Sequence, residues 1–390
     1  MSFIMRRTKQ LKIGWLFPYS GIFTNLRKDL QQGSDIAFHK QDMAPEIGAY
    51  PAFIQSGGLK DTEDALKKML HYDEVDLVIG VVSTKVALQL IPLLEDQKTP
   101  MILLNLGADI PTDRLSSEYL FYNSLHLWKS EWAMGKWSQK KYGGEPSVNL
   151  SIYEAGYGLH EAFKSGAAAS GALTVKMNIV KNFSPSPDTS PLIQYIRAQQ
   201  PTHAHALLSG IEGSQFLQLF KDQDLGAATG LTINPFMAED GSIPDIAGSL
   251  QHHNAMTWSL GLDTPGNADF TSRYRSAYEG SPNVFALLAY EAGLALAAAA
   301  DDLQGETSGK AWAEALHRSA QLGPRGSIRL STRPLDTEMP VYIRHLVKDP
   351  LTGILSNKVL ETVTGIEWND LMLVAEQTYL TGWQNPYLCV

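Results

Sequence analysis

Apolar and polar residues near the start of the chain follow each other in blocks that predict a strand, a tight loop and a helix. Residues 11–17 form an apolar run, and the turn residues Pro18-Tyr19-Ser20-Gly21 come directly after it. After a polar gap, apolar or small residues recur at helical spacing, at Leu26, Leu30, Gly33 and Ala37. A short apolar run bounded by turns is typical of a buried strand, and the second spacing is typical of one helix face. The stretch therefore predicts the first half of a βαβ unit.

The same pattern repeats through the first third of the chain. Strands are predicted at 52–55, 75–82 and 101–104, and helices between them are predicted to start at N-cap residues Asp61 and Ser83. Strands that alternate with helices predict a doubly wound parallel sheet.

A second α/β half is predicted from about residue 148 onwards. Its expected strands are 148–153, 173–179, 204–208 and 231–234, and two of its helices are expected at 191–199 and 214–223. Two more helices, 268–278 and 283–302, follow, and the second is apolar enough to lie across the sheet of the first half. Residues 341–347 and 358–363 alternate as antiparallel strands do.

Length and charge narrow the class of protein. With 390 residues the chain exceeds the size at which a single core usually stops growing, so two lobes are expected. The net charge is −9 and no run of basic residues is longer than a pair such as Arg6-Arg7, which argues against a nucleic-acid partner. No apolar stretch reaches the 20 or so residues that a membrane span requires, so no membrane insertion is expected.

The chain ends offer little chemistry. The single cysteine, Cys389, lies next to the last residue, where the backbone lacks the rigid support that a nucleophile or metal ligand requires. Residues 1–9 carry charge without the apolar core of a secretory signal. Either the protein works in the cytoplasm, or a signal has been removed or omitted from this chain.

Sequence motifs for cofactors, metals and catalysis are not found. There is no GxGxxG or Walker A sequence and no GxSxG nucleophile elbow. His203 and His205 would share one face of a strand, but no third ligand is nearby, and a metal needs three or four. We interpret this pair, and His252-His253, as structural or surface residues. No cofactor, no metal and no catalytic residue is predicted.

Polar and aromatic residues gather just after the predicted strands. Ser83-Thr84 precedes a helix, where it would act as an N-cap and where a helix N-terminus also favours an anion. Residues 19–21, 105–108 and 153–157 follow other strands and carry hydroxyls, small residues and aromatic rings. Residues 235–240 follow a strand of the second half and add acids. The loops at the carboxyl ends of parallel strands are where ligands bind, so these segments predict a small-molecule cleft.

The order of these segments resembles the type I periplasmic binding proteins, the leucine/isoleucine/valine-binding family of ABC transporters. The similar stretches are 13–21, 29–37, 78–84, Gly156-Tyr157-Gly158 and Ala289-Tyr290-Glu291-Ala292. They occur in the family's order and span about Lys12 to Val347.

The resemblance implies two Rossmann-like lobes, joined by three crossovers, that close on a ligand. The first lobe would comprise residues 10–122 and 255–330, and the second 123–254 and 331–365. Residues 366–390 would form an appended, partly packed tail.

The resemblance also implies a binding site. Residues matching Ser83-Thr84 and Asn105 to Ala108 would hold a ligand carboxylate, and Tyr157 with an acid near Glu239 would face an ammonium group. The expected ligand-binding residues are Tyr19, Ser20, Ser83, Thr84, Asn105, Leu106, Gly107, Tyr153, Tyr157, Phe236 and Glu239. Tyr153-Glu154-Ala155 and Pro235-Phe236-Met237 depart from the family's pattern, which weighs against an amino acid as the ligand.

The leading hypothesis is therefore a periplasmic solute-binding protein that delivers a small carboxylate-bearing ligand to a membrane permease of an ABC transporter. A cytoplasmic ligand-sensing regulator on the same fold is an alternative that suits the absent signal. A hydrolase is a third alternative, for which no nucleophile–base pair can be named.

Overall fold

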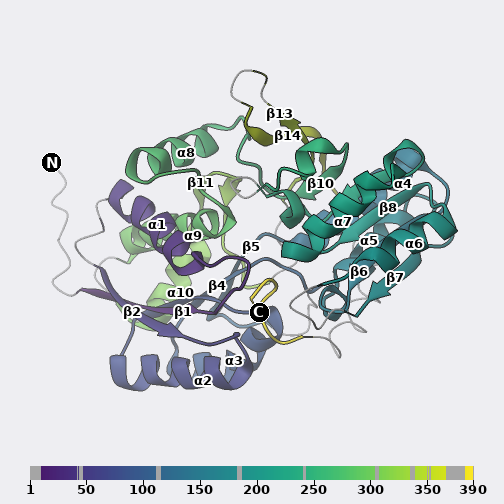
Figure 1. Ribbon diagram of the computed structural model, residues 1–390. Helices are drawn as coiled ribbons and strands as arrows, with labels where there is room; N and C mark the ends of the chain where they lie inside the picture. The colour runs from purple at the N-terminus through teal and green to yellow at the C-terminus, as the bar shows by residue number, and fades with distance from the viewer. Residues whose placement is uncertain are drawn as a thin grey trace.

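Two α/β lobes lie side by side in the computed structural model, each around its own sheet (Figure 1). The structure describes residues 10–389 except 42, 44–46, 111–115, 182–186, 240–242, 304–306, 334–338, 349, 351–352 and 366–382. The predicted fold class, two Rossmann-like lobes, is confirmed.

The first lobe is built on a five-stranded parallel sheet. Its strands in spatial order are β2 (Ile47–Phe53), β1 (Leu11–Phe17), β3 (Leu77–Val81), β4 (Met101–Asn105) and β5 (Leu120–Ser124). The strands β3, β4 and β5 are buried along their whole length, as expected for a parallel sheet covered on both faces. Strand β2 lies at the edge, which explains why it tolerates Pro51 and alternates between half-buried and exposed positions.

Helices cover both faces of this sheet. They are α1 (Leu26–Lys40), α2 (Leu59–Lys68), α3 (Thr84–Gln97), α8 (Pro265–Ala277), α9 (Val284–Asp302) and α10 (Gly309–Arg318). Helices α2 and α3 lie on one face and α1 and α9 on the other (Figure 1). A short hairpin of β11 (Gln321–Gly323) and β12 (Gly326–Ile328) packs against α9.

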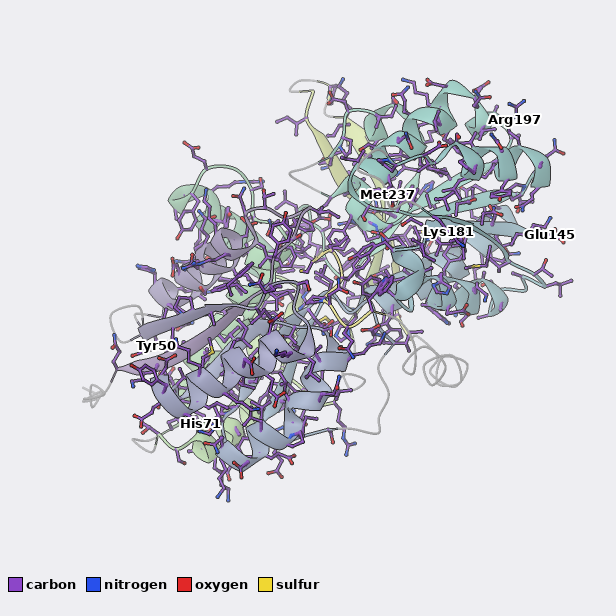
Figure 2. The ribbon with its side chains drawn as sticks, turned by 60° about the horizontal axis from the view of Figure 1, so that its bottom comes forward. Tyr50, His71, Glu145, Lys181, Arg197 and Met237 are labelled. Atoms are coloured by element: carbon purple, nitrogen blue, oxygen red, sulfur yellow. The ribbon has the colours of Figure 1, made fainter. Side chains whose placement is uncertain are left out.

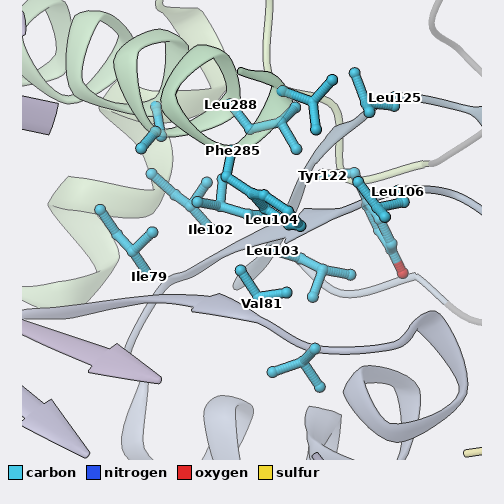
Figure 3. Packing of buried hydrophobic residues seen from close by; sticks show 14 of the residues in the cluster. Ile79, Val81, Ile102, Leu103, Leu104, Leu106, Tyr122, Leu125, Phe285 and Leu288 are labelled. Atoms are coloured by element: carbon cyan, nitrogen blue, oxygen red, sulfur yellow. The ribbon is translucent and has the colours of Figure 1, made fainter. Parts of the chain in front are cut away.

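Helix α9 lies across the first sheet, as its apolar sequence predicts. Its Phe285 and Leu288 pack over the β4 residues Ile102 and Leu104 (Figure 3). Of the described helices, α9 alone has the length and composition of a membrane span, but 83% of that window is buried inside the protein, where it serves as a core helix. Helix α1 approaches it so closely that a Cβ on Gly33 would lie 2.1 Å from the carbonyl oxygen of Ala286.

The second lobe is built on a seven-stranded mixed sheet. Its strands in spatial order are β14 (Leu355–Val363), β13 (Val341–Lys348), β10 (His253–Met256), β9 (Gly230–Ile233), β8 (His203–Leu207), β6 (Pro146–Ser151) and β7 (Lys176–Val180). The last two strands of the chain, β13 and β14, are antiparallel as predicted. Its helices are α4 (Leu127–Tyr142), α5 (Leu159–Ala168), α6 (Ser190–Gln199) and α7 (Gly210–Asp222).

The chain passes between the lobes after β5, after β10 and again between Ser331 and Val341, of which 334–338 lie outside the described residues. The first two passages are tied together, because Thr257 Oγ1 donates to the carbonyl of Leu125 at 2.8 Å. Arg325 is buried beside them, where it pairs with Glu291 and donates to the carbonyl of Ser124 at 2.7 Å. This buried arginine therefore anchors the connection to the core of the first lobe.

Several predicted boundaries differ from the structure. Helix α2 begins at Leu59 with Gly58 as its N-cap, so Asp61 lies within its first turn instead of capping it. Helix α7 begins at Gly210, four residues before the predicted start at Ser214, because Ser209 is extended and the glycine-rich residues after it form the first turn. The sequence placed the second passage between the lobes at residues 254–255. Strand β10 pairs within the second sheet as far as Met256, so the chain crosses to the first lobe after that residue.

Candidate ligand-binding site

A segment from the end of the chain lies between the two lobes. The described part of the expected tail, residues 383–389, runs past the carboxyl ends of strands from both sheets and is drawn in yellow (Figure 1). From a second direction it again lies between the lobe that carries Tyr50 and the lobe that carries Glu145 (Figure 2). Leu388 and Cys389 are completely buried and Tyr387 is 4% exposed. We call residues 383–389 the C-terminal segment.

The first lobe holds this segment with hydroxyl groups. Ser20 Oγ donates to the carbonyl oxygen of Leu388, and Ser83 Oγ donates to that of Gln384. Ser83 is also the N-cap of α3, as predicted, because its Oγ accepts a hydrogen bond from the backbone N–H of Val86 at 3.2 Å. The same side chain thus starts the helix and faces the space between the lobes.

A buried ion pair lies next to Ser83. Lys85 Nζ is 3.1 Å from Asp109 Oδ1, with both side chains about one-tenth exposed, and it also donates to the carbonyl of Trp383 at 3.4 Å. Burial raises the pKa of Asp109, and the charge of Lys85 opposes that rise. A lysine in the first turn of a helix is opposed by the helix dipole. Its position is explained by the negative and carbonyl groups that it faces.

The second lobe presents two tyrosines to the segment. The hydroxyls of Tyr153 and Tyr157 are 3.2 Å apart. Tyr153 accepts a hydrogen bond from the backbone N–H of Leu388 at 2.9 Å, and Tyr157 donates to the carbonyls of Asn385 at 3.3 Å and Pro386 at 3.5 Å. Both tyrosines therefore form hydrogen bonds with the backbone of the segment.

The ring of Tyr387 is enclosed by aromatic rings of the second lobe. Its centroid lies 5.0 Å from that of Tyr157 and 6.1 Å from that of Phe236. Its hydroxyl accepts a hydrogen bond from Asn234 Nδ2 at 2.8 Å and interacts with the carboxyl group of Glu154. Burial raises the pKa of Glu154 to about 7, against the opposing effect of the Tyr387 hydroxyl. The site therefore holds a phenol by its ring and by its hydroxyl.

Asn234 is held in the orientation that this contact requires. Its Oδ1 accepts from the backbone N–H of Phe236 at 2.9 Å and caps the short turn η5 (Pro235–Ala238). Its Nδ2 is thereby directed at the Tyr387 hydroxyl. The same turn places Phe236 against Phe23 of the first lobe, with ring centroids 5.7 Å apart, so the lobes are in contact here.

Other expected residues line the remaining space. Asn105 Nδ2 donates to Thr84 Oγ1 at 3.0 Å, and Leu106 follows it along the wall. Gly107 has φ of +68°, and a Cβ there would lie 2.7 Å from the Cα of His126, so this turn requires glycine. The cavity left among these residues and the segment has a volume of about 10 Å³, which is room for about one water molecule. The interlobe cleft is therefore filled by the chain itself.

The structure brings most of the expected residues together. Those that line the cleft or contact the C-terminal segment are Ser20, Ser83, Thr84, Asn105, Leu106, Gly107, Tyr153, Tyr157 and Phe236. Tyr19 instead is 54% exposed. Glu239 is buried within the second lobe, where its carboxylate lies 3.8 Å from the guanidinium of Arg344. Tyr19 therefore leaves much of its side chain to solvent, and Glu239 faces a cation of its own lobe.

Among the described residues of the cleft, Lys85, Asp109, Glu154 and Asn234 were not predicted as binding residues. Each lies within or next to a segment that the sequence predicted for the cleft, so the periodicity located the loops but not all of the side chains that face the C-terminal segment. The placement of Lys85 in the first turn of a predicted helix is one signal that could have been used, since a cation there requires a partner.

The histidines lie away from this cleft. His205 Nε2 is 2.8 Å from Glu131, and its ring is stacked on Phe163, inside the second lobe. Burial lowers the pKa of His203 to about 4. Among the described residues no group of three or more His, Cys, Asp or Glu side chains is arranged to hold a metal ion.

Comparison with known proteins agrees with this architecture. Residues 10–349 match the family model of the periplasmic binding proteins. The chain belongs to the periplasmic binding protein family. The prediction from sequence is thus confirmed at the level of the family and of solute binding. No match is found among curated protein sequences.

Solved structures of other periplasmic binding proteins share the fold. An ABC transporter substrate-binding protein from Sphaerobacter thermophilus has a TM-score of 0.79 at 19% identity, over 91% of this chain and 98% of that one. A solute-binding protein from Rhodopseudomonas palustris, solved with 3,4-dihydroxybenzoic acid, has a TM-score of 0.76 at 21% identity, over 92% and 98%. A leucine-binding protein from Thermotoga maritima has a TM-score of 0.69 at 17% identity, over 91% and 99%.

Proposed function

We propose that this protein is the extracytoplasmic solute-binding component of an ABC transporter and that its solute is an aromatic carboxylate bearing a ring hydroxyl. The permease of that transporter is its proposed partner, and the solute is bound and released without chemical change. The observation that carries the ligand class is the seating of the Tyr387 phenol ring between aromatic side chains, with its hydroxyl against Asn234 and Glu154.

The second lobe supplies the phenol-binding end of the proposed site. A solute ring in the place of Tyr387 would lie parallel to the ring of Tyr153 and meet Tyr157 in a T-shaped contact, and its hydroxyl would accept from Asn234. The Glu154 carboxyl would face the proton of that hydroxyl. A hydroxyl that accepts from a buried donor is distinguished from an unsubstituted ring, because loss of the hydroxyl would leave the Asn234 amide unpaired.

The first lobe supplies the carboxylate-binding end. Ser83 and Lys85 donate to carbonyl oxygens of the C-terminal segment, and a solute carboxylate would offer these donors oxygens of greater charge. The N-terminus of α3 adds a favourable dipole for an anion at the same place. The two ends belong to different lobes, so a solute that carries both groups gains most when the lobes are closed.

The related structures include binders of aromatic acids and of aliphatic amino acids, and the geometry of the site distinguishes between these two ligand classes. The Rhodopseudomonas palustris neighbour holds a dihydroxybenzoate, whereas the Thermotoga maritima neighbour is a leucine-binding protein. An α-amino acid would bring an ammonium group, which the sequence placed near Glu239. That carboxylate faces Arg344 instead, so the geometry favours the aromatic acid.

Binding measurements with a small panel of solutes test the proposal. Titration calorimetry and thermal shifts on the full chain should show binding of 4-hydroxybenzoate, weaker binding of benzoate and none of leucine. A solute at 100 times its dissociation constant stabilises the native state by about 2.7 kcal/mol, which is readily seen. Recovery of the bound solute unchanged would support binding without turnover. Binding of leucine in preference to both benzoates would overturn the ligand class.

A further inference from the structure

We propose that the C-terminal segment, residues 383–389, is an internal ligand of the interlobe cleft, which the solute displaces when it binds. The contacts of the segment alone show that it occupies the cleft. The competition with the solute rests on the proposed function, because it requires the solute to bind in the same cleft. The segment would thereby set the solute concentration at which the protein loads.

Both lobes hold the backbone of the segment. From the first lobe, Ser83 and Lys85 donate to the carbonyls of consecutive residues, Gln384 and Trp383. From the second lobe, the carbonyl of Gly156 accepts from the N–H of Trp383 at 3.0 Å. A segment bonded to both lobes stabilises their closed arrangement, which is the effect that a ligand has.

The segment also has a shape that its surroundings maintain. The N–H of Cys389 donates to the carbonyl of Pro386 at 3.0 Å, which closes a turn, and Asn385 Nδ2 donates to the carbonyl of Cys389 at 3.3 Å. Within this turn Leu388 has φ of +64°, a conformation that residues other than glycine adopt rarely. The buried contacts of Leu388 with Ser20 hold it there.

The segment places a phenol where the proposed solute places its own. Tyr387 occupies the place proposed for the solute ring and bonds to Asn234. The Gln384 carbonyl of the segment accepts from Ser83, which would bind the solute carboxylate. Among the described residues, the cavity beside the segment in this cleft measures about 10 Å³, which is too small for a solute of the size of a benzoate. Segment and solute therefore cannot be bound together.

Covalent attachment makes this competition intramolecular. The segment is part of the same chain as strand β14, so its local concentration at the cleft does not depend on the protein concentration. The apparent dissociation constant of the solute then equals the intrinsic value divided by the fraction of molecules whose cleft is free. Weakening the segment should tighten solute binding.

Cys389 provides a reporter in the unmodified chain. It is the only cysteine of the sequence and its side chain is fully buried, so its reaction with a thiol reagent such as DTNB requires the segment to leave. The full chain should react slowly, and urea-unfolded chain rapidly. Replacement Tyr387→Ala should raise the native rate at least about tenfold, because truncating a buried aromatic anchor loses most of its binding energy. The matched control is Tyr72→Ala, a tyrosine that is 81% exposed, which should react like the original chain.

Solute addition tests the competition itself. 4-Hydroxybenzoate should accelerate the reaction of Cys389 in proportion to occupancy, and Tyr387→Ala should bind this solute at least about tenfold more tightly than the original chain. Native Cys389 that reacts as fast as in unfolded chain, with no effect of Tyr387→Ala, would overturn the internal ligand. So would solute binding that leaves Cys389 protected. Acceleration by Tyr387→Ala with no binding of any panel solute would support the internal ligand while overturning the proposed function.

Discussion

The two lobes hold the same segment with different chemistry. The first lobe uses Ser20, Ser83 and Lys85, which all donate to carbonyl oxygens. The second lobe also hydrogen-bonds to the segment backbone through Tyr153 and Tyr157. In addition, it surrounds the Tyr387 side chain with aromatic rings, Asn234 and Glu154. The donors of the first lobe can bind any ligand with accessible oxygen atoms. The residues around Tyr387 in the second lobe fit a ring that carries a hydroxyl at one position. The comparison therefore assigns general anion and carbonyl binding to the first lobe and selectivity to the second.

The largest effect is expected from breaking the charged pair of the first lobe. Lys85→Met leaves Asp109 buried without its partner, which should destabilise the protein by about 3 to 5 kcal/mol. The double variant Lys85→Met with Asp109→Leu removes both charges and should recover most of that stability. Chemical denaturation measures both values. If Lys85 binds the solute carboxylate, the double variant should have a lower affinity for hydroxybenzoate than the original chain, although its stability is recovered. Full affinity in the double variant would break the assignment.

A pH dependence sharpens the assignment for the second lobe. The pKa of Glu154 is raised from 4.5 to about 7 in the folded protein, chiefly by burial. The native state therefore holds a proton that the unfolded state releases near pH 4.5. This stabilisation is fully present below pH 4.5 and is lost as the pH rises through 7, amounting to at most about 3 kcal/mol. Glu154→Gln keeps the size of the side chain and removes its titration.

The comparison of Glu154→Gln with the original chain isolates this group. Burial lowers the pKa of His203, His252 and His253 to about 4, and these residues act in the opposite direction between pH 4 and 6.5. The difference in unfolding free energy between the two chains cancels them. As the pH rises from 5 to 9, the unfolding free energy of the original chain should fall relative to that of the glutamine variant. An unchanged difference would show that Glu154 does not titrate in the cleft.

The next effect concerns discrimination between two solutes. Asn234→Leu removes the donor to the solute hydroxyl, and an unmade buried hydrogen bond costs about 1 to 3 kcal/mol, or roughly fivefold to 150-fold in affinity. The ratio of 4-hydroxybenzoate to benzoate affinity should fall by this factor, as measured by calorimetry, because loosening of the C-terminal segment affects both solutes equally. Gln218→Ala, an exposed amide on α7, serves as the control and should bind both solutes normally. Equal losses for the two solutes would argue that Asn234 acts on the fold and does not read the hydroxyl.

The sequence predicted the loops of the cleft better than its side chains, and the reason is physical. Strand and helix periodicity places a loop such as 105–108 at the carboxyl edge of a sheet, and the structure agrees. Periodicity does not tell which side chain of a loop turns inward. Glu154 and Glu239 both follow strands of the second lobe, but the first faces Tyr387 and the second faces Arg344 of strand β13.

The end of the chain shows a similar limit of local pattern. Its aromatic residues indicated that it packs against the protein. The hydroxyl of Tyr387 bonds to Asn234, however, which lies about 150 residues earlier in the sequence. No local rule links two segments so far apart. The lobes, by contrast, are built from neighbouring strands and helices whose apolar faces are visible in sequence, as for the face of α1 that contains Gly33.

The smallest effect is expected at Tyr19, which the sequence placed in the binding site on the first-lobe side. Its side chain is 54% exposed, and the residue that turns into the cleft from the same loop is Ser20. Tyr19→Ala should change the unfolding free energy by no more than about 0.5 kcal/mol, and hydroxybenzoate affinity by about twofold at most. Ser20→Ala is the informative neighbour, since loss of its hydrogen bond to Leu388 should accelerate the thiol reaction of Cys389, whereas Tyr19→Ala should not. A substantial loss of affinity in Tyr19→Ala would mean that the first lobe also contributes an aromatic contact to the solute, and the division of chemistry between the lobes would have to be given up.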